Sequence, residues 1–297
     1  MEQTLAQRIV RDTLAVVVVG LFMFPIFWWA LASIKPISAL FNKDEVVFFN
    51  FVPTLINYAV VLLGLSRTEV ALETGGSTFG TGGASTYDSR QTILDSIYVA
   101  LGSTTLTIIL AVLAAYALSR MHFRGRQGYL NWILSQRFLP PIAIVVPIVF
   151  MFRDLGLRDT YRGLILVHTL MNLPIAVLLL KSFMDDVPRD VDEAATIDGA
   201  TRFQTFWKIV LPMVKGGVAA AAVLCFIFSW TEFLLSLFLT NSIRTLPVKI
   251  TTFVTSTGSE WGFISALGTS AIVPSFIFIL LVQKQLVRGL TLGSLKD

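Results

Sequence analysis

Long apolar stretches that are nearly free of charged side chains dominate this sequence. Each runs for about 20 residues, the length that an α-helix needs to cross the hydrocarbon core of a bilayer. The candidate spans are residues 13–34, 96–119, 129–152, 163–180, 217–239 and 261–283. Charged residues make up only 14% of the chain, whereas soluble domains have about 25%, so a water-soluble fold could not cover its surface. We therefore predict an all-α integral membrane protein with six transmembrane helices.

Positively charged residues are unevenly distributed between the segments that join these spans. With both termini in the cytoplasm, the inner segments carry more Lys and Arg than the outer ones, which is the usual bias of cytoplasmic loops. The clearest case is the loop after the second span, where Arg120, Arg124 and Arg126 occur without an acidic residue. We expect both termini inside. We also expect the first apolar run to be retained, because no small-residue cleavage site follows it.

Residues that could carry catalysis, metal binding or phosphate binding are scarce. Cys225 is the only cysteine, and His122 and His168 are far apart in the sequence without a carboxylate cluster. We therefore predict no catalytic residue, no metal and no cofactor in this chain. The glycine-rich stretch 75–83, in the long outer segment 35–95, lacks the Lys-Ser/Thr of a phosphate-binding loop. We expect a flexible loop there and no ATP hydrolysis by this chain.

The longest inner segment, between the fourth and fifth spans, has the local signals of two short helices. Pro188 and the acidic residues within 190–193 suit a helix start, because the helix dipole favours negative charge at that end. Gly199 stands where a helix end needs a left-handed residue. Thr201 and Gln204 have the spacing of a capping box that opens a second helix. The segment is predicted to form a helical hairpin.

The second helix of this hairpin is predicted to be amphipathic. Phe203, Phe206, Trp207 and Val210 share one face by helical spacing, and Pro212 marks the transition into the fifth span. The pattern alone leaves three uses open for such a hairpin: lying along the membrane, packing beneath its own bundle, or docking onto a partner.

The residues of the hairpin carry a family resemblance. Glu193-Ala194-Ala195 is followed after three residues by Gly199, after nine more by Ile209, and after one more by Leu211-Pro212. This order and spacing resemble the coupling-loop signature of permease subunits in binding-protein-dependent ABC importers. Residues 115–120, with Phe123 and Gly125, and residues 286–291 resemble the maltose-type carbohydrate and polyol subfamily.

The resemblance implies a type I ABC importer permease fold with a cytoplasmic helical coupling hairpin. It places the coupling loop near residues 188–212, and the hairpin would insert into a cleft on an ATPase subunit. Glu193 would offer a charge to a basic partner, Gly199 would supply the turn, and the face of Phe203, Phe206 and Trp207 would form the buried contact. The predicted ATPase-coupling residues are Glu193, Ala194, Ala195, Asp198, Gly199, Phe203, Ile209, Leu211 and Pro212.

The resemblance also implies the remaining organisation and the partners. Residues 1–91 would hold the N-terminal tail, the first span and a long periplasmic loop, residues 92–284 the transmembrane domain, and residues 285–297 a cytoplasmic tail. The expected partners are a second homologous permease, a cytoplasmic ATPase dimer that binds ATP and Mg²⁺, and a periplasmic solute-binding protein. No nucleic acid is expected as a partner. The expected location is the bacterial inner membrane, as a multi-pass protein.

Two charged residues inside the predicted spans are candidates for the translocation pathway, because charges are costly in a bilayer. Arg137 interrupts the third span and Glu232 the fifth. They could line the path of the solute, or they could serve only as structural partners of each other or of backbone carbonyls. Asn172 and Trp230 are further pathway candidates, the latter because its ring could stack on a sugar.

The sequence does not distinguish a sugar from a polyol as the transported solute. Residues 137–141, Arg-Phe-Leu-Pro-Pro, are similar to those of polyol- and glycerol-type members of the subfamily. We therefore count glycerol-like compounds among the expected solutes. The alternative function is a secondary active transporter in which Arg137 and Glu232 form a coupling pair. Such folds usually show internal repeats, and none is evident in the sequence.

Overall fold

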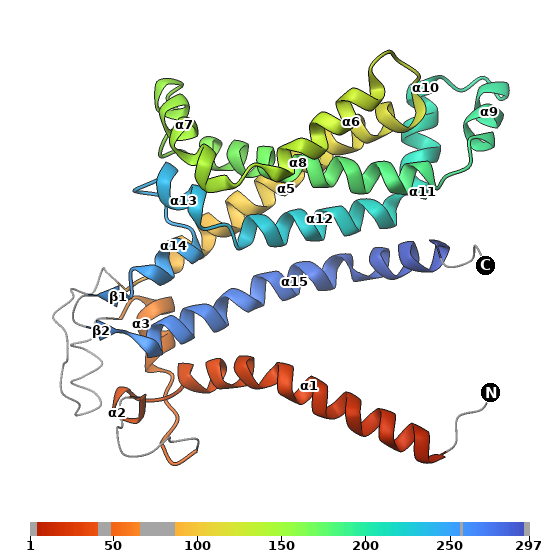
Figure 1. Ribbon diagram of the computed structural model, residues 1–297. Helices are drawn as coiled ribbons and strands as arrows, with labels where there is room; N and C mark the ends of the chain where they lie inside the picture. Colours follow the sequence, from red (N-terminus) through yellow and green to blue (C-terminus); the bar gives the residue numbers. More distant parts are fainter. Residues whose placement is uncertain (1–4, 41–48, 66–86, 256–257, 294–297) are drawn as a thin grey trace. The chain divides into compact units, whose positions relative to one another are not determined.

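The computed structural model describes residues 5–40, 49–65, 87–255 and 258–293. These residues divide into two units, Met1–Gln91 with Ile250–Ile272, and Thr92–Lys249 with Val273–Asp297. Helices dominate both units, and the strands among the described residues form one short hairpin (Figure 1). The all-α prediction is therefore confirmed apart from this hairpin. The glycine-rich stretch 75–83 lies outside the described residues.

The first unit is built around the N-terminal helix. Its elements are α1 (Leu5–Ser33), α2 (Ile37–Leu40), α3 (Ile56–Leu63), the antiparallel strands β1 (Val254–Thr255) and β2 (Gly258–Ser259), and the first part of α15 (Trp261–Gly293). Asn57 of α3 donates from Nδ2 to the carbonyl oxygens of Ser33 (2.8 Å) and Lys35 (3.0 Å). The buried amide thereby satisfies carbonyl groups at and just beyond the end of α1, which would otherwise lack partners.

The second unit contains the inner helices and both candidate sites. Its elements are α5 (Arg90–Arg120), α6 (Arg126–Ser135), the 3₁₀ turn η2 (Gln136–Phe138), α7 (Pro141–Asp154), α8 (Tyr161–Asp185), α9 (Asp190–Ile197), α10 (Arg202–Thr205), the π-helical turn η3 (Phe206–Val210), α11 (Leu211–Met213), α12 (Lys215–Trp230), α13 (Leu234–Leu239) and α14 (Leu246–Thr251). α5 and α14 cross the boundary to the first unit by a few residues, and α15 continues from the first unit into this one.

Helix length and composition agree with the predicted spans, with two breaks. Among the described residues, four helices are long and apolar enough to cross a membrane, and six candidates result if each of two bent pairs counts as one span. The continuous ones are 9–33, 90–120, 161–185 and 261–283. α15 runs on to Gly293, beyond its predicted end.

The predicted third span is not one straight helix. It consists of residues 126–138 and α7, which meet at an angle of 99°. Leu139 and Pro140 separate the two parts in extended conformation, because a residue that precedes a proline is disfavoured in the helical region. Pro141 then opens α7, where its missing N–H costs no helical hydrogen bond. Arg137 therefore lies on a 3₁₀ turn at a break.

The predicted fifth span is also interrupted. α12 ends at Trp230 and α13 begins at Leu234, so Glu232 lies between two helices. At its other end, α12 meets residues 202–213 at 74°. The prediction of a single helix from 217 to 239 was wrong at this position.

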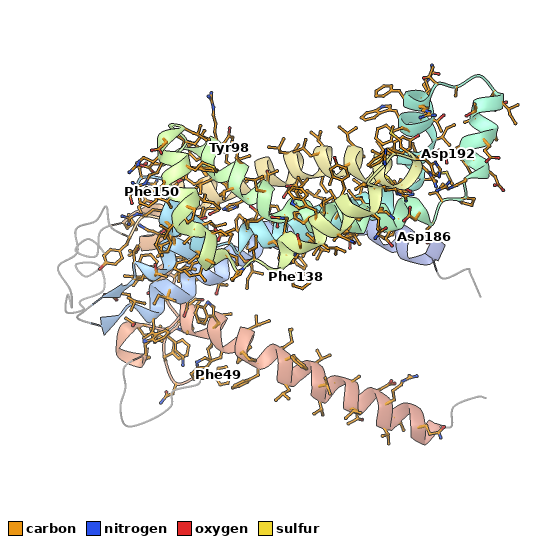
Figure 2. All side chains as sticks on the ribbon, turned by 45° about the horizontal axis from the view of Figure 1, so that its top comes forward. Phe49, Tyr98, Phe138, Phe150, Asp186 and Asp192 are labelled. Carbon is orange, nitrogen blue, oxygen red and sulfur yellow. The ribbon has the colours of Figure 1, made fainter. Side chains whose placement is uncertain are left out.

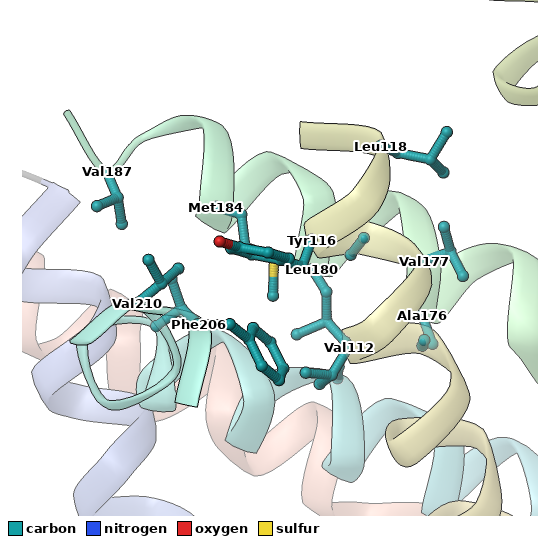
Figure 3. Close-up of a cluster of buried hydrophobic side chains, with 14 of the residues drawn as sticks. Val112, Tyr116, Leu118, Ala176, Val177, Leu180, Met184, Val187, Phe206 and Val210 are labelled. Carbon is teal, nitrogen blue, oxygen red and sulfur yellow. The ribbon is translucent and has the colours of Figure 1, made fainter. Parts of the chain in front are cut away.

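A buried apolar cluster holds the second unit together at the end that carries α9 and α10. Figure 3 shows side chains from α5, α8 and η3 converging in it. The rings of Tyr116 and Phe206 lie 4.7 Å apart between centroids, and Leu180 and Met184 are fully buried. The hairpin after α8 is therefore fastened to α5 and α8 through η3.

Candidate functional site

The hairpin formed by α9 and α10 lies at one end of the second unit. Asp186 and Asp192, near its start, are at the opposite end of this unit from Tyr98 and Phe150 (Figure 2). Asp190, Asp192 and Glu193 fall in the first turn of α9, as predicted. The hairpin therefore projects from the same end of the bundle as the loop that follows α5.

The turn between the two helices has the predicted local chemistry. Gly199 has φ +81°, in the left-handed region that residues with a side chain rarely adopt. The capping box is present: the Gln204 N–H donates to Thr201 Oγ1 (3.3 Å), and the Thr201 N–H donates to Gln204 Oε1 (2.8 Å). Both structural predictions for this turn are confirmed.

An ion pair anchors α9 to α5. Arg120 Nε lies 3.1 Å from Asp192 Oδ2 in an ion contact without hydrogen-bond alignment, and Arg120 Nη2 donates to the Val187 carbonyl oxygen at 2.8 Å. The Arg120 side chain is only 8% exposed. A small cavity of about 180 Å³ beside it is lined by residues that include Glu193 and Arg202. Arg120 thus fixes the first helix of the hairpin from inside the bundle.

The predicted apolar face of the hairpin divides into two. Phe203 and Trp207 are 71% and 58% exposed, and their rings stack at 6.4 Å between centroids. Phe206 and Val210 are buried in the core cluster instead. The π-helical turn η3 begins at Phe206, and each half of the divided face is an i, i+4 pair. The prediction that Phe206 belongs to an exposed contact face was wrong.

Exposure of the other predicted coupling residues varies. Glu193, Ala194, Asp198, Gly199 and Pro212 are exposed, Ile209 and Leu211 are half-buried, and Ala195 is buried. Ile197, at the end of α9, is 86% exposed although it was not singled out in the sequence. Ile197, Phe203 and Trp207 together are called the apolar tip of the hairpin below.

A second candidate site is a cavity of about 640 Å³ within the second unit. Its walls come from α5, α6, η2, α7, α8, α12 and α13 and from the break after α12, and they include Arg137, Asn172 and Glu232. Trp230 is not among the lining residues, because its ring is buried and stacked on Phe226 at 5.6 Å. The structure therefore brings three of the four predicted pathway residues together.

Glu232 is held by the backbone of α13 and by a histidine. Its Oε1 accepts from the Leu235 N–H (2.8 Å), and its Oε2 accepts from the N–H (3.0 Å) and the hydroxyl (2.9 Å) of Ser236. His168 Nε2 lies 3.4 Å from Oε2. Among the described residues, no ion pair joins Glu232 to Arg137, so the alternative in which these two charges pair with each other is not formed.

Comparison with known proteins identifies the chain. Residues 107–292 match the family model described as "Binding-protein-dependent transport system inner membrane component". The chain belongs to this permease family. Relatives include the sulfoquinovosyl glycerol transport system permease protein of Agrobacterium fabrum, 36% identical over 92% of this chain and 89% of the relative, and the trehalose transport system permease protein of Mycobacterium tuberculosis, 34% identical over 97% and 96%.

A solved structure supports the fold of this permease. The present chain matches a chain in the crystal structure of a bacterial ABC transporter involved in the import of the acidic polysaccharide alginate. The TM-score is 0.70 at 21% identity, and the match covers 96% of this chain and 99% of the other. The fold is that of an ABC importer permease. ATP hydrolysis belongs to a separate subunit, so this permease is not an enzyme.

Sequence reasoning missed His168 as a partner of Glu232. No carboxylate lies near His168 in the sequence, since Glu232 is 64 positions away. A signal was available, since an ionisable residue inside an otherwise charge-free span is a functional candidate by default. His168 meets that criterion as well as Arg137 and Glu232 do.

At the end of the second unit away from the hairpin, hydrogen bonds that the sequence did not predict join two loops. Asp159, at φ +58°, accepts at Oδ1 from the N–H groups of Asn241 (2.9 Å) and Ser242 (3.0 Å) and at Oδ2 from the Ser242 hydroxyl (2.8 Å). Burial opposes ionisation, but these hydrogen bonds outweigh it and hold the pKa of Asp159 below its usual value. The loop before α8 is thereby joined to the loop after α13.

Proposed function

We propose that this permease moves a sugar or a polyol through the membrane, driven by an ATPase that docks on the α9–α10 hairpin. The observation that carries the proposal is the apolar tip, since Ile197, Phe203 and Trp207 are exposed on a hairpin that is anchored firmly from inside. Exposed apolar patches mark interaction surfaces, and aromatic side chains supply much of the energy at such surfaces.

The coupling residues have complementary roles in this proposal. Glu193 and Asp198 offer negative charge on the exposed side of α9, and Gly199 shapes the turn that presents the tip. Ile209, Leu211 and Pro212 connect the hairpin to α12, and buried Ala195 lets α9 lie close to the bundle. A movement of the docked ATPase would pass to α5 through Arg120 and Asp192.

The relatives support the solute class. Their names specify sulfoquinovosyl glycerol, trehalose and, for a relative from Streptomyces coelicolor, diacetylchitobiose. These compounds share a carbohydrate part, which favours a sugar or a glycerol-like polyol as the solute here. The lining of the 640 Å³ cavity by Arg137, Asn172 and Glu232 supports a solute path along it, and Trp230 has no part in this path.

The complete importer in this proposal has four kinds of component. This chain pairs with a second homologous permease, binds a cytoplasmic ATPase dimer that holds ATP and Mg²⁺, and receives the solute from a periplasmic binding protein. The arginine-rich loop after α5 and the hairpin leave the bundle at the same end, and the bias of cytoplasmic loops toward Arg supports both termini inside. Residues 1–91, 92–284 and 285–297 remain the proposed functional division of the chain.

Reconstituted vesicles test the proposal. Uptake of radiolabelled trehalose and other sugars from a panel is measured with the permease pair, the ATPase and the binding protein. We expect uptake to require ATP and the binding protein together. Uptake by this chain alone, driven by an ion gradient, would instead favour a secondary transporter. The double variant F203A/W207A should abolish ATP-driven uptake, and F123A, an exposed aromatic outside the tip, serves as the matched control.

A further inference from the structure

A chain of buried polar groups, which includes His168 and Ser229 of the cavity lining, fixes the Glu232 carboxylate. The His168 ring is fully buried, with Nδ1 2.7 Å from Ser229 Oγ and Nε2 3.2 Å from Ser236 Oγ. The Ser103 hydroxyl of α5 lies 2.8 Å from Ser229 Oγ and 3.2 Å from the Ala100 carbonyl oxygen, and its one proton serves one of these acceptors at a time. α12, α13 and the break after α12 thus meet at the imidazole carried by α8, and α5 joins the network through Ser229.

The positions of the serine hydroxyl protons determine which nitrogen of the His168 ring donates a hydrogen bond and which accepts one. Ser236 gives its only hydroxyl proton to the carboxylate of Glu232, so His168 Nε2 must be the donor in its contact with Ser236. When Ser103 donates to Ser229, Ser229 has its own proton left for His168 Nδ1. Each of these protons is then used once, and His168 Nε2–H is directed at Ser236 and Glu232. An ionised Glu232 is satisfied by donors on this side without any contact to Arg137.

The cavity side of the same carboxylate is less occupied. Among the described residues, Oε1 accepts one hydrogen bond, from Leu235, although a carboxylate oxygen can accept two. The Glu232 side chain remains 17% exposed and lines the cavity. The cavity volume of about 640 Å³ falls within the range of small-molecule sites. A solute in the cavity can therefore reach one open acceptor position.

Arg137 offers the opposite chemistry in the lining of the same cavity. Its guanidinium only donates hydrogen bonds, and within the described part of the chain it forms neither an ion pair nor a hydrogen bond. A hydroxyl group can donate to Glu232 and accept from Arg137, whereas a carboxylate or sulfonate could meet only Arg137 and would be repelled by Glu232. The two charges together favour a neutral solute with several hydroxyl groups.

We infer that this chain itself contacts the solute, in a subsite where Glu232 Oε1 accepts a hydroxyl of a neutral polyhydroxylated compound and Arg137 donates to another. His168 belongs to the cavity lining, but its side chain is fully buried and both ring nitrogens are engaged by Ser229 and Ser236, so it is a positioning residue in this subsite. The inference rests on the proposed function, because it assigns the chemical class of the solute to the cavity of an importer.

A reactive cysteine in the cavity wall tests the inference on the complete importer in vesicles. C225A removes the native cysteine and L170C places a thiol on the lining, where Leu170 is exposed. Modification of this chain by a water-soluble maleimide is followed by mass spectrometry with D-glucose or D-glucuronate present, since these differ by one carboxylate. We expect D-glucose to slow modification and D-glucuronate not to. Equal or stronger protection by D-glucuronate, or none by either compound, would overturn the inference.

Variants at Glu232 and His168 test the roles assigned to them. E232Q should raise the concentration of D-glucose that gives half protection by about tenfold, because a neutral amide replaces the charged acceptor. H168Q should retain protection because its amide can donate to Glu232 and accept from Ser229, whereas H168L should lose it. T231A, which removes a neighbouring hydroxyl bonded to the Ile227 carbonyl, is the control and should protect like the parent.

The possible failures are distinguishable. Half-protecting concentrations in E232Q or H168L that equal the parent value would overturn the subsite or the positioning role. The comparison of D-glucose with D-glucuronate needs no change at Glu232, so it stands even if a variant fails to assemble. ATP-dependent and binding-protein-dependent uptake by the parent importer without protection by D-glucose would overturn the subsite and leave the proposed function intact.

Discussion

The α9–α10 hairpin and the polar network at the cavity are built in opposite ways. The hairpin turn depends on neighbours in sequence, since Thr201 and Gln204 cap each other across three positions. The cavity network joins Ser103 to Ser229 across 126 positions and His168 to Ser229 across 61. The first kind of structure is specified by local chemistry, whereas the second exists only after the helices have packed.

The two regions also differ in what their polar groups do. In the hairpin, caps and the left-handed glycine shape the backbone and leave apolar side chains exposed. In the cavity network, buried polar side chains fix one another and leave a carboxylate facing an internal space. A surface for a protein partner and a surface for a small solute thus arise from different balances of local and long-range contacts.

The sharpest test of the comparison lies where the hairpin meets the core. F206A removes a ring that packs on Tyr116 and is only 3% exposed, so we expect a loss of about 3–5 kcal/mol in the free energy of unfolding. F203A removes an exposed ring from the apolar tip and should change stability by less than about 0.5 kcal/mol. Thermal unfolding of the purified complex measures both, and equal effects would contradict the division of the apolar face.

The cavity side has a matched pair of hydroxyl groups. S236A deletes a fully buried hydroxyl that serves both Glu232 and His168, so we expect a loss of about 1–3 kcal/mol. T231A deletes an exposed hydroxyl bonded within its own helix turn and should have little effect. Unfolding in denaturant measures the two differences. Equal small losses would mean that the network contributes no more than a local bond.

The hairpin turn can be tested without disturbing any packing. At Gly199 a Cβ would meet no heavy atom within 4 Å, so the positive φ is the obstacle to a side chain. G199V should destabilise the turn by about 1–2 kcal/mol and should uncouple ATP hydrolysis from uptake. G199N should be milder, because Asn tolerates the left-handed conformation. ATPase rates and uptake measured together decide the outcome, and normal uptake in G199V would count against the coupling role.

Removing the hydrogen bonds of Asp159 should give the smallest loss of stability, and this loss should depend on pH. Its pKa is lowered in the folded state, so its stabilisation is present above the unfolded pKa of about 3.9 and is lost as the pH falls through the lower folded value. We expect D159N to cost about 1 kcal/mol near neutral pH and nothing in strong acid. Hydrogen exchange at the amides of Asn241 and Ser242 measures the loss of stability. A difference between D159N and the parent chain that grows toward low pH would contradict the prediction.

Sequence alone predicted those parts of the molecule that depend on composition and on near neighbours. Six apolar candidates, the turn at Gly199 and the capping box follow from hydropathy, backbone conformation and side-chain spacing. The breaks at Leu139–Pro140 and around Glu232 were missed because charge-free runs measure length and not continuity. The partnership of His168 with Glu232 depends on which helices become neighbours, and no local pattern encodes that.

The π-helical turn at Phe206–Val210 has a consequence for how such hairpins change in evolution. A π turn contains one residue more than an α turn, so it is a place where the chain can lose or gain a residue while the flanking helices persist. Removing one residue there would turn the π turn into an α turn and would change which side chains of Phe206–Val210 face the core. The hairpin can therefore change its buried contacts by one residue while the membrane-spanning helices keep their sequence.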